Sequence, residues 1–139
     1  SPVAFTAQTL RTCSYKEIES PLLLIAADLL DNVVLHTEIR EKGGAYGSGA
    51  NYSPSTGNFY LYSYRDPNLS KTLSSFQQSL EKIAAGDFDE DDLEEAKFGV
   101  IQGLDTPIPP GHRALTAYSW QRSGITSEQR QAFRNAILE

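Results

Sequence analysis

The feature that most constrains the fold of this chain is an apolar segment with helical spacing near its start. Ser20 is a candidate N-cap, Pro21 fits the first helical position, and Gly43 and Gly44 end the segment. So wide an apolar face must be buried against other elements. We therefore predict a helix over residues 21–41 that is central to the core. Its apolar residues are Leu22, Leu23, Ile25, Ala26, Leu29, Leu30, Val33 and Val34.

The segments on either side of this helix have the patterns of β-strands. Residues 3–10 alternate enough for one strand, and residues 45–64 hold two aromatic-rich runs around a Ser-Pro-Ser-Thr-Gly-Asn loop typical of a hairpin. In the second run Tyr60, Tyr62 and Tyr64 face one side of the sheet. Packing within the sheet explains these tyrosines, and so does a wall that contacts a ligand. Both interpretations stay open.

The rest of the chain has helical patterns. Asp66 with Pro67 repeats the cap-and-proline start, and Asp89 is a candidate cap of a later helix. The spacing predicts helices over residues 67–85, 90–104, 113–123 and 127–138. The buried faces expected on the first two of these are Leu69, Leu73, Phe76, Leu80 and Ile83, then Leu93, Ala96, Val100 and Leu104.

The order of these elements predicts an α+β domain. A strand, a helix, a hairpin and then helices indicate a largely antiparallel sheet with helices packed on one face. The length of 139 residues and the hydrophobic share of 40% suit one domain, residues 1–139, with a real core. The chain starts without methionine and stops within a helical pattern. We therefore expect a domain that is incomplete at its ends and comes from a longer protein.

Charge and cysteine content restrict the partners. Seven of the 18 acidic residues lie between Asp87 and Glu95, which is typical of a solvated helix start, and no basic stripe suggests nucleic acid. No apolar run approaches the about 18 residues of a membrane span. We expect neither a nucleic-acid nor a membrane partner. The single cysteine, Cys13, excludes an internal disulfide and favours an intracellular compartment, bacterial cytoplasm or organelle matrix, without determining it.

A metal site is not expected within this chain. His36 and His112 are far apart, and neither belongs to a paired zinc motif such as His-Glu-x-x-His or its inverted form. Glu38 follows His36 by two residues, a spacing that does not share a helix face. Cys13 has no evident histidine partner for a nucleophilic site and is interpreted as a packing residue.

Residues 40–49 are the candidate functional segment. Four glycines in seven positions allow close approach of another backbone. Tyr46 can donate a hydrogen bond to a peptide carbonyl, and Arg40 can add a positive charge beside it. A glycine-terminated helix whose last carbonyls accept from Arg40 explains the same residues. Chemistry alone leaves the two interpretations about equal.

Residues 35–47 (LHTEIREKGGAYG) resemble the Arg/Tyr segment in the C-terminal half of insulinase-type zinc peptidases. Within it, REKGGAYG is most similar to the presequence protease branch of that family. Residues 62–69 (YSYRDPNL), 94–97 (EEAK) and 109–111 (PPG) follow in the order expected for the family. The resemblance therefore covers nearly the whole chain.

This resemblance implies a peptidase of two homologous halves that close around an unfolded peptide. The family's N-terminal half holds zinc through an inverted His-x-x-Glu-His motif and a distal glutamate. The C-terminal half supplies an arginine and a tyrosine near the scissile bond, and Arg40 and Tyr46 match them. Only these two residues carry over from the family; the close approach that glycine allows makes Gly43 and Gly44 the expected backbone contacts to the substrate. The zinc motif has no match in this chain, so zinc is expected in the N-terminal half of the same protein.

We therefore expect the last or nearly last quarter of a zinc endopeptidase that degrades short unstructured peptides. Its partners would be the peptide and the zinc-binding half, and the chain alone would be inactive. One alternative is a non-catalytic scaffold homologue, against which the retained Arg40 and Tyr46 argue. The other is a peptide-binding module that uses an exposed sheet edge.

Overall fold

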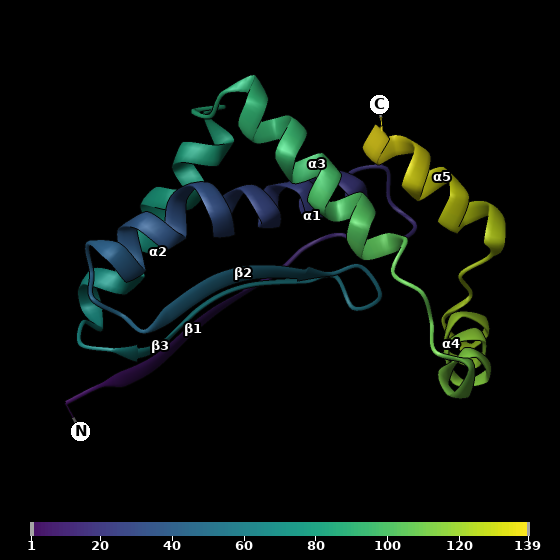
Figure 1. The fold of residues 1–139 in the computed structure, drawn as a ribbon, viewed down its shortest axis with the longest axis horizontal. Helices are drawn as coiled ribbons and strands as arrows, with labels where there is room; N and C mark the ends of the chain where they lie inside the picture. The colour runs from purple at the N-terminus through teal and green to yellow at the C-terminus, as the bar shows by residue number, and fades with distance from the viewer. Residues whose placement is uncertain (1, 139) are drawn as a thin grey trace.

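The structure is a computed structural model that describes residues 2–138. Its sheet consists of β1 (Ala4–Arg11), β2 (Gly47–Ser53) and β3 (Asn58–Asp66), in the order β1-β3-β2 with both pairs antiparallel. Helices cover one face of this sheet (Figure 1). The predicted α+β class and the one-sided arrangement are confirmed.

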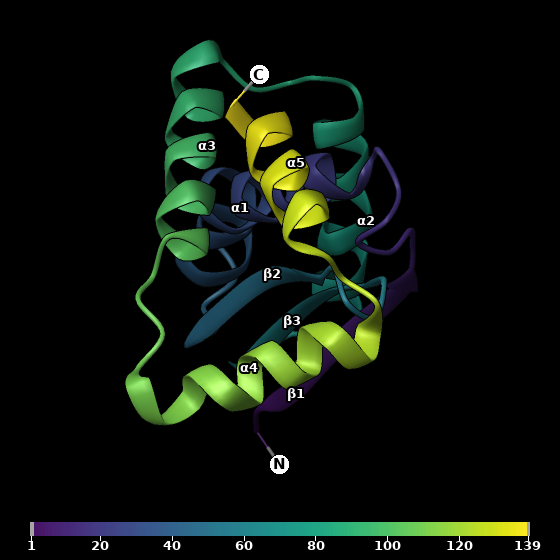
Figure 2. The same ribbon diagram turned by 90° about the vertical axis from the view of Figure 1, so that its right-hand side faces the viewer.

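The helical layer begins with α1 (Ser20–Leu29), which continues directly into a π-helical segment, η1 (Leu30–Glu41). The later helices are α2 (Ser70–Ala84), α3 (Glu90–Leu104), α4 (Pro110–Ser123) and α5 (Ser127–Leu138). Figures 1 and 2 show α4 standing apart from this layer, beyond one end of the sheet, and none of its residues is buried. Between residues 2 and 138, no helix has both the length and the apolar character of a membrane span.

Two clusters of buried residues form the core. The first lies between the sheet and the helices and consists of Ala27, Leu30, Leu35, Ile39, Ala45, Tyr52, Phe59, Leu61 and Phe76. The second joins α1, α3 and α5 through Ile25, Leu29, Ala96, Phe133 and Ile137. Because the α1–η1 segment contributes to both, it is the central element of the core.

The predicted helix over residues 21–41 is α-helical only to Leu29. Beyond that point backbone hydrogen bonds span five residues, as where Lys42 N–H donates to the Thr37 carbonyl at 2.9 Å. The buried residues of η1 accordingly recur at intervals of four, one and four: Leu30, Val34, Leu35 and Ile39.

Ser20 is not the N-cap that its sequence position predicts. The residue before α1 makes no side-chain cap bond. Instead the Ser20 side chain is fully buried, and its hydroxyl lies 2.6 Å from the Tyr52 hydroxyl on β2. Tyr52 in turn donates to the Cys13 carbonyl at 2.7 Å. A contact across 32 residues has replaced the local cap.

Asp66 is likewise not the cap of α2, which begins at Ser70. Its buried carboxylate accepts hydrogen bonds from the Ser63 hydroxyl (2.8 Å), the Asn68 N–H (2.8 Å) and the Thr72 hydroxyl (2.5 Å). It therefore joins the end of β3 to the first turn of α2.

The predicted buried faces extend too far toward the helix ends. Leu22 and Leu73 lie in first turns, Leu69 precedes α2, and Leu104 ends α3; all four are exposed. Packing against neighbouring elements covers the middle of α1, α2 and α3 and leaves these end positions in solvent.

Candidate functional site

The turn between η1 and β2 is shaped by two adjacent glycines. A Cβ at position 43 would lie 2.5 Å from the Ile39 carbonyl oxygen, so this position has no room for a side chain and requires glycine. Gly44 has φ of +78°, which glycine adopts without strain. Asn68 Nδ2 donates to the Gly43 carbonyl at 2.6 Å. These contacts account for both glycines through the turn itself, and a substrate contact through them stays a prediction.

Tyr46 follows this turn and projects into solvent, with 62% of its surface exposed. Its backbone N–H donates to the Arg65 carbonyl at 3.3 Å. Its ring lies 5.7 Å from the Tyr64 ring and 5.2 Å from the Arg65 guanidinium carbon. Among residues 2–138 its hydroxyl has no hydrogen-bond partner. The phenol is therefore free to donate to another molecule.

Arg40 lies in the last turn of η1, on the other side of the glycines. Its guanidinium Nη1 is 3.4 Å from His36 Nε2, and His36 Nδ1 is 3.6 Å from a Glu41 carboxylate oxygen. The side chains of His36 and Glu41 are both exposed. Within the described part of the chain no hydrogen bond joins Arg40 to Tyr46. Arg40 and Tyr46 thus lie on opposite sides of the glycine turn, and their joint action on one substrate stays a prediction.

The tyrosines of β3 form a row on the sheet face opposite the helices. Their neighbours Phe59, Leu61 and Ser63 are buried on the helical side, so the three tyrosines share one side of β3, as the alternation predicted. Along the open face the ring centroids of Tyr60 and Tyr62 are 6.0 Å apart, and those of Tyr62 and Tyr64 are 6.4 Å apart. Because Tyr64 also contacts Tyr46, four phenol rings make one continuous row.

Glycines of β2 make room for this row. Gly47 pairs with Tyr64 and Gly49 pairs with Tyr62, and a Cβ at either glycine would collide with the ring of its partner. Burial, together with the nearby Asp31 carboxylate and the adjacent phenols, raises the pKa of Tyr62. The rings therefore pack on β2, which supports the structural interpretation of the tyrosines and gives a second reason for these glycines. The sequence alone did not indicate that the tyrosine rings pack on these glycines.

Two aspartates along the α1–η1 segment have raised pKa values, because burial disfavours their charged forms. Burial raises the pKa of Asp28, the Asn32 amide opposes the change, and Glu95 adds to it. Burial and the charge of Asp28 raise the pKa of Asp31, and His36 opposes them. Neither aspartate forms a hydrogen bond with Arg40 or Tyr46 among the described residues.

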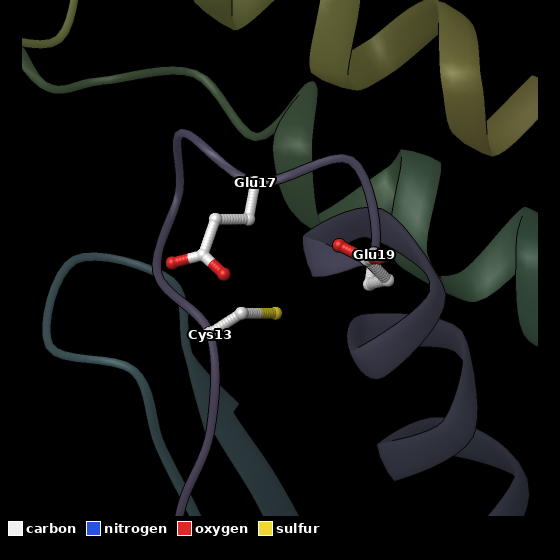
Figure 3. A group of neighbouring side chains, drawn as sticks. All are labelled: Cys13, Glu17 and Glu19. Carbon is white, nitrogen blue, oxygen red and sulfur yellow. The ribbon is translucent and has the colours of Figure 1, made fainter.

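A second group of polar side chains lies in the loop before α1. The Cys13 sulfur and carboxylate oxygens of Glu17 and Glu19 all lie within 4.8 Å of one another (Figure 3). Thiolate and carboxylate are zinc ligands, and the sequence analysis did not single out this group. Both glutamates are exposed, and among the residues that the structure describes no histidine joins them, so the group does not resemble the histidine-based site of a zinc hydrolase.

The chain matches known proteins over almost its whole length. The profile of a family described as the PreP C-terminal domain matches residues 8–139. The mitochondrial presequence protease of Mus musculus is 40% identical over 137 residues, which are 99% of this chain and 13% of that protein. That of Yarrowia lipolytica is 42% identical over 125 residues, 90% of this chain and 12% of that protein.

Solved structures share the fold at low sequence identity. The inactive peptidase domain of a candidate zinc protease from Bordetella parapertussis superimposes with a TM-score of 0.82 at 15% identity, over 97% of this chain and 78% of that one. A conserved protein from Enterococcus faecalis gives 0.74 at 19% identity, over 95% of this chain and 33% of that one. At these low identities the two structures show that the fold is shared, and nothing more.

Proposed function

This chain belongs to the PreP C-terminal domain family, and on that basis we propose that it is the zinc-free C-terminal part of a presequence-type metalloendopeptidase. The full-length protein would degrade short unstructured peptides. The observation that supports an active-site role is the exposed Tyr46 hydroxyl, which has no partner among the described residues and stands across a glycine turn from Arg40. Because the chain spans 13% of the mouse relative, activity, substrate and partner are all part of this proposal.

The proposed chemistry assigns one task to each side chain. The Tyr46 phenol donates a hydrogen bond to the scissile carbonyl oxygen, and the bond strengthens as negative charge develops on that oxygen. The Arg40 guanidinium supplies a permanent positive charge and several donors beside it. Both effects increase when the N-terminal half covers the site and excludes water.

Zinc, which would activate the attacking water in the full-length protein, belongs to the other half in this proposal. His36 contacts Arg40 and Glu41, and no second histidine joins it in the described part of the chain. The residues present therefore do not fit the family's zinc site. The isolated chain should bind no stoichiometric zinc and hydrolyse no peptide, as elemental analysis after dialysis and a quenched-peptide assay would measure. One tightly bound zinc with chelator-sensitive turnover would contradict this split arrangement.

The central test is Tyr46→Phe in the full-length enzyme, since it keeps the ring and removes only the donor. Loss of one oxyanion donor should lower kcat by about 10²–10³ with zinc content unchanged. Tyr118→Phe is the matched control, because Tyr118 on α4 is similarly exposed, at 57%, and lies outside the site. Arg40→Lys should also lower kcat, since an ammonium cannot reproduce the planar fork.

The alternatives predict different results. If Tyr46→Phe raises KM and leaves kcat normal, Tyr46 only binds peptide and the chain acts as a binding module. A full-length protein with no turnover and no zinc would be a scaffold homologue. The mouse and Yarrowia relatives are named as mitochondrial proteins. On that basis we propose an organelle matrix as the compartment of the full-length protein.

A further inference from the structure

We propose that Arg65 is a positioning residue that holds the Tyr46 phenol in its working orientation. This inference rests on the proposed function, because the orientation matters only if the Tyr46 hydroxyl meets a peptide carbonyl. The starting observation is independent of that function. Arg65 has φ of +49° and is the sole non-glycine residue between positions 2 and 138 with positive φ.

The left-handed backbone of Arg65 belongs to a β-bulge. On β1, Ala4 pairs with Asp66 and the next residue, Phe5, pairs with Tyr64, so Arg65 has no partner in the β1–β3 ladder. An extra residue in one strand resets the alternation of its side chains. The bulge is thus a change of register at the end of β3 nearest the candidate site.

This change of register decides which side chains reach Tyr46. Ser63 and Asp66, three residues apart, are both buried and share a hydrogen bond of 2.8 Å. The two residues between them, Tyr64 and Arg65, both contact the Tyr46 ring on the exposed side. Under strict alternation only one of these neighbours would lie on that side.

Tyr46 depends on these contacts because it has few others. Its ring is mostly exposed, and within residues 2–138 it contacts the Tyr64 ring at 5.7 Å, tilted by 55°, and the Arg65 guanidinium at 5.2 Å. The same arginine accepts the Tyr46 N–H through its carbonyl. One residue therefore restrains both the backbone and the ring of Tyr46, through a hydrogen bond and a cation–π contact.

The choice of residue type supports a role beyond the fold. Glycine would adopt this φ without strain and leave the carbonyl available to Tyr46, whereas a residue with a Cβ is strained there. Backbone strain that persists beside a candidate site motivates a functional hypothesis. What arginine adds and glycine lacks is the guanidinium over the ring.

The test is Arg65→Gly in the full-length enzyme. The unfolding midpoint should stay or rise, since glycine removes the strain. The value of kcat should fall about three- to tenfold, the size of one cation–π contact, with KM changed less than about twofold. Arg65→Lys keeps a cation for the ring and should recover most of the lost kcat. Arg11→Ala, which removes an exposed strand arginine at the opposite end of the sheet, controls for net charge.

A double-mutant cycle with Tyr46→Phe separates the possible failures. If Arg65 acts through the Tyr46 hydroxyl, Arg65→Gly should cost no further kcat once that hydroxyl is gone. A normal kcat for Tyr46→Phe alone would refute the proposed function. A lowered kcat for Tyr46→Phe with a wild-type kcat for Arg65→Gly would refute only the positioning role. Equal losses in both backgrounds, or a lowered unfolding midpoint, would also overturn it.

Discussion

The buried hydroxyl pair between α1 and β2 provides a sharp test of the fold. Ser20 donates to the Tyr52 oxygen at 2.6 Å if Tyr52 uses its own proton on the Cys13 carbonyl at 2.7 Å. Tyr52→Phe removes the hydroxyl that links these two hydrogen bonds. It leaves the fully buried Ser20 hydroxyl and the Cys13 carbonyl unpaired. The orphaned buried hydroxyl of Ser20 costs about 1–3 kcal/mol, and the part-buried Cys13 carbonyl adds about 1 kcal/mol, so we expect a loss of about 2–4 kcal/mol.

The effect of Ser20→Ala should reverse its sign with the residue at position 52. In the wild-type chain it removes one hydrogen bond and should cost about 0.5–1.5 kcal/mol, because Tyr52 still donates to Cys13. In the Tyr52→Phe chain it removes a buried hydroxyl that has lost its partner, and it should restore about 1 kcal/mol. The two backgrounds therefore differ in sign as well as size.

Urea denaturation of the four variants measures this cycle, from the midpoint and slope of each transition. An N-cap serine would give a different pattern, since its bond to the helix backbone does not involve Tyr52. If Ser20→Ala costs the same in both backgrounds, the tertiary contact is wrong and the local cap is right.

Two further predictions use the same measurement. Leu29→Ala should cost about 2–5 kcal/mol, since Leu29 is 2% exposed, whereas Leu22→Ala at 61% exposure should change stability by less than about 0.5 kcal/mol; equal costs would mean that the core is misplaced. Burial and Asp28 raise the pKa of Asp31, so ionisation opposes folding. Asp31→Asn should therefore stabilise the chain above that raised pKa, and the gain should vanish as pH falls below the ordinary aspartate value; a gain independent of pH would refute this.

Local signals in the sequence predicted those parts of the fold that depend on near neighbours. Asp89 caps α3 as expected, with its carboxylate accepting from the Asp92 N–H at 2.8 Å and the Asp92 carboxylate accepting from the Asp89 N–H. The alternation around Tyr62 placed the three tyrosines on one side of β3. Such features span three residues or fewer, so a pattern within the chain is enough to reveal them.

The features that escaped prediction depend on distant contacts. Ser20 has the residue type and position of an N-cap, but its side chain forms a hydrogen bond with Tyr52 across the core. The bulge at Arg65 becomes visible only when β1 is aligned with β3. For the site itself, Arg40 and Tyr46 were found through a resemblance, because a glycine-ended helix explained the same residues equally well, and their catalytic roles stay predictions.

The strand order has a practical consequence for handling this chain. With β3 in the centre, β1 and β2 each pair on one side only within the described residues. Unpaired strand edges invite edge-to-edge association between molecules. Refolding yield should therefore decline as protein concentration rises, and dilute conditions or a lysine on the outer edge of β1 should keep more of the material monomeric.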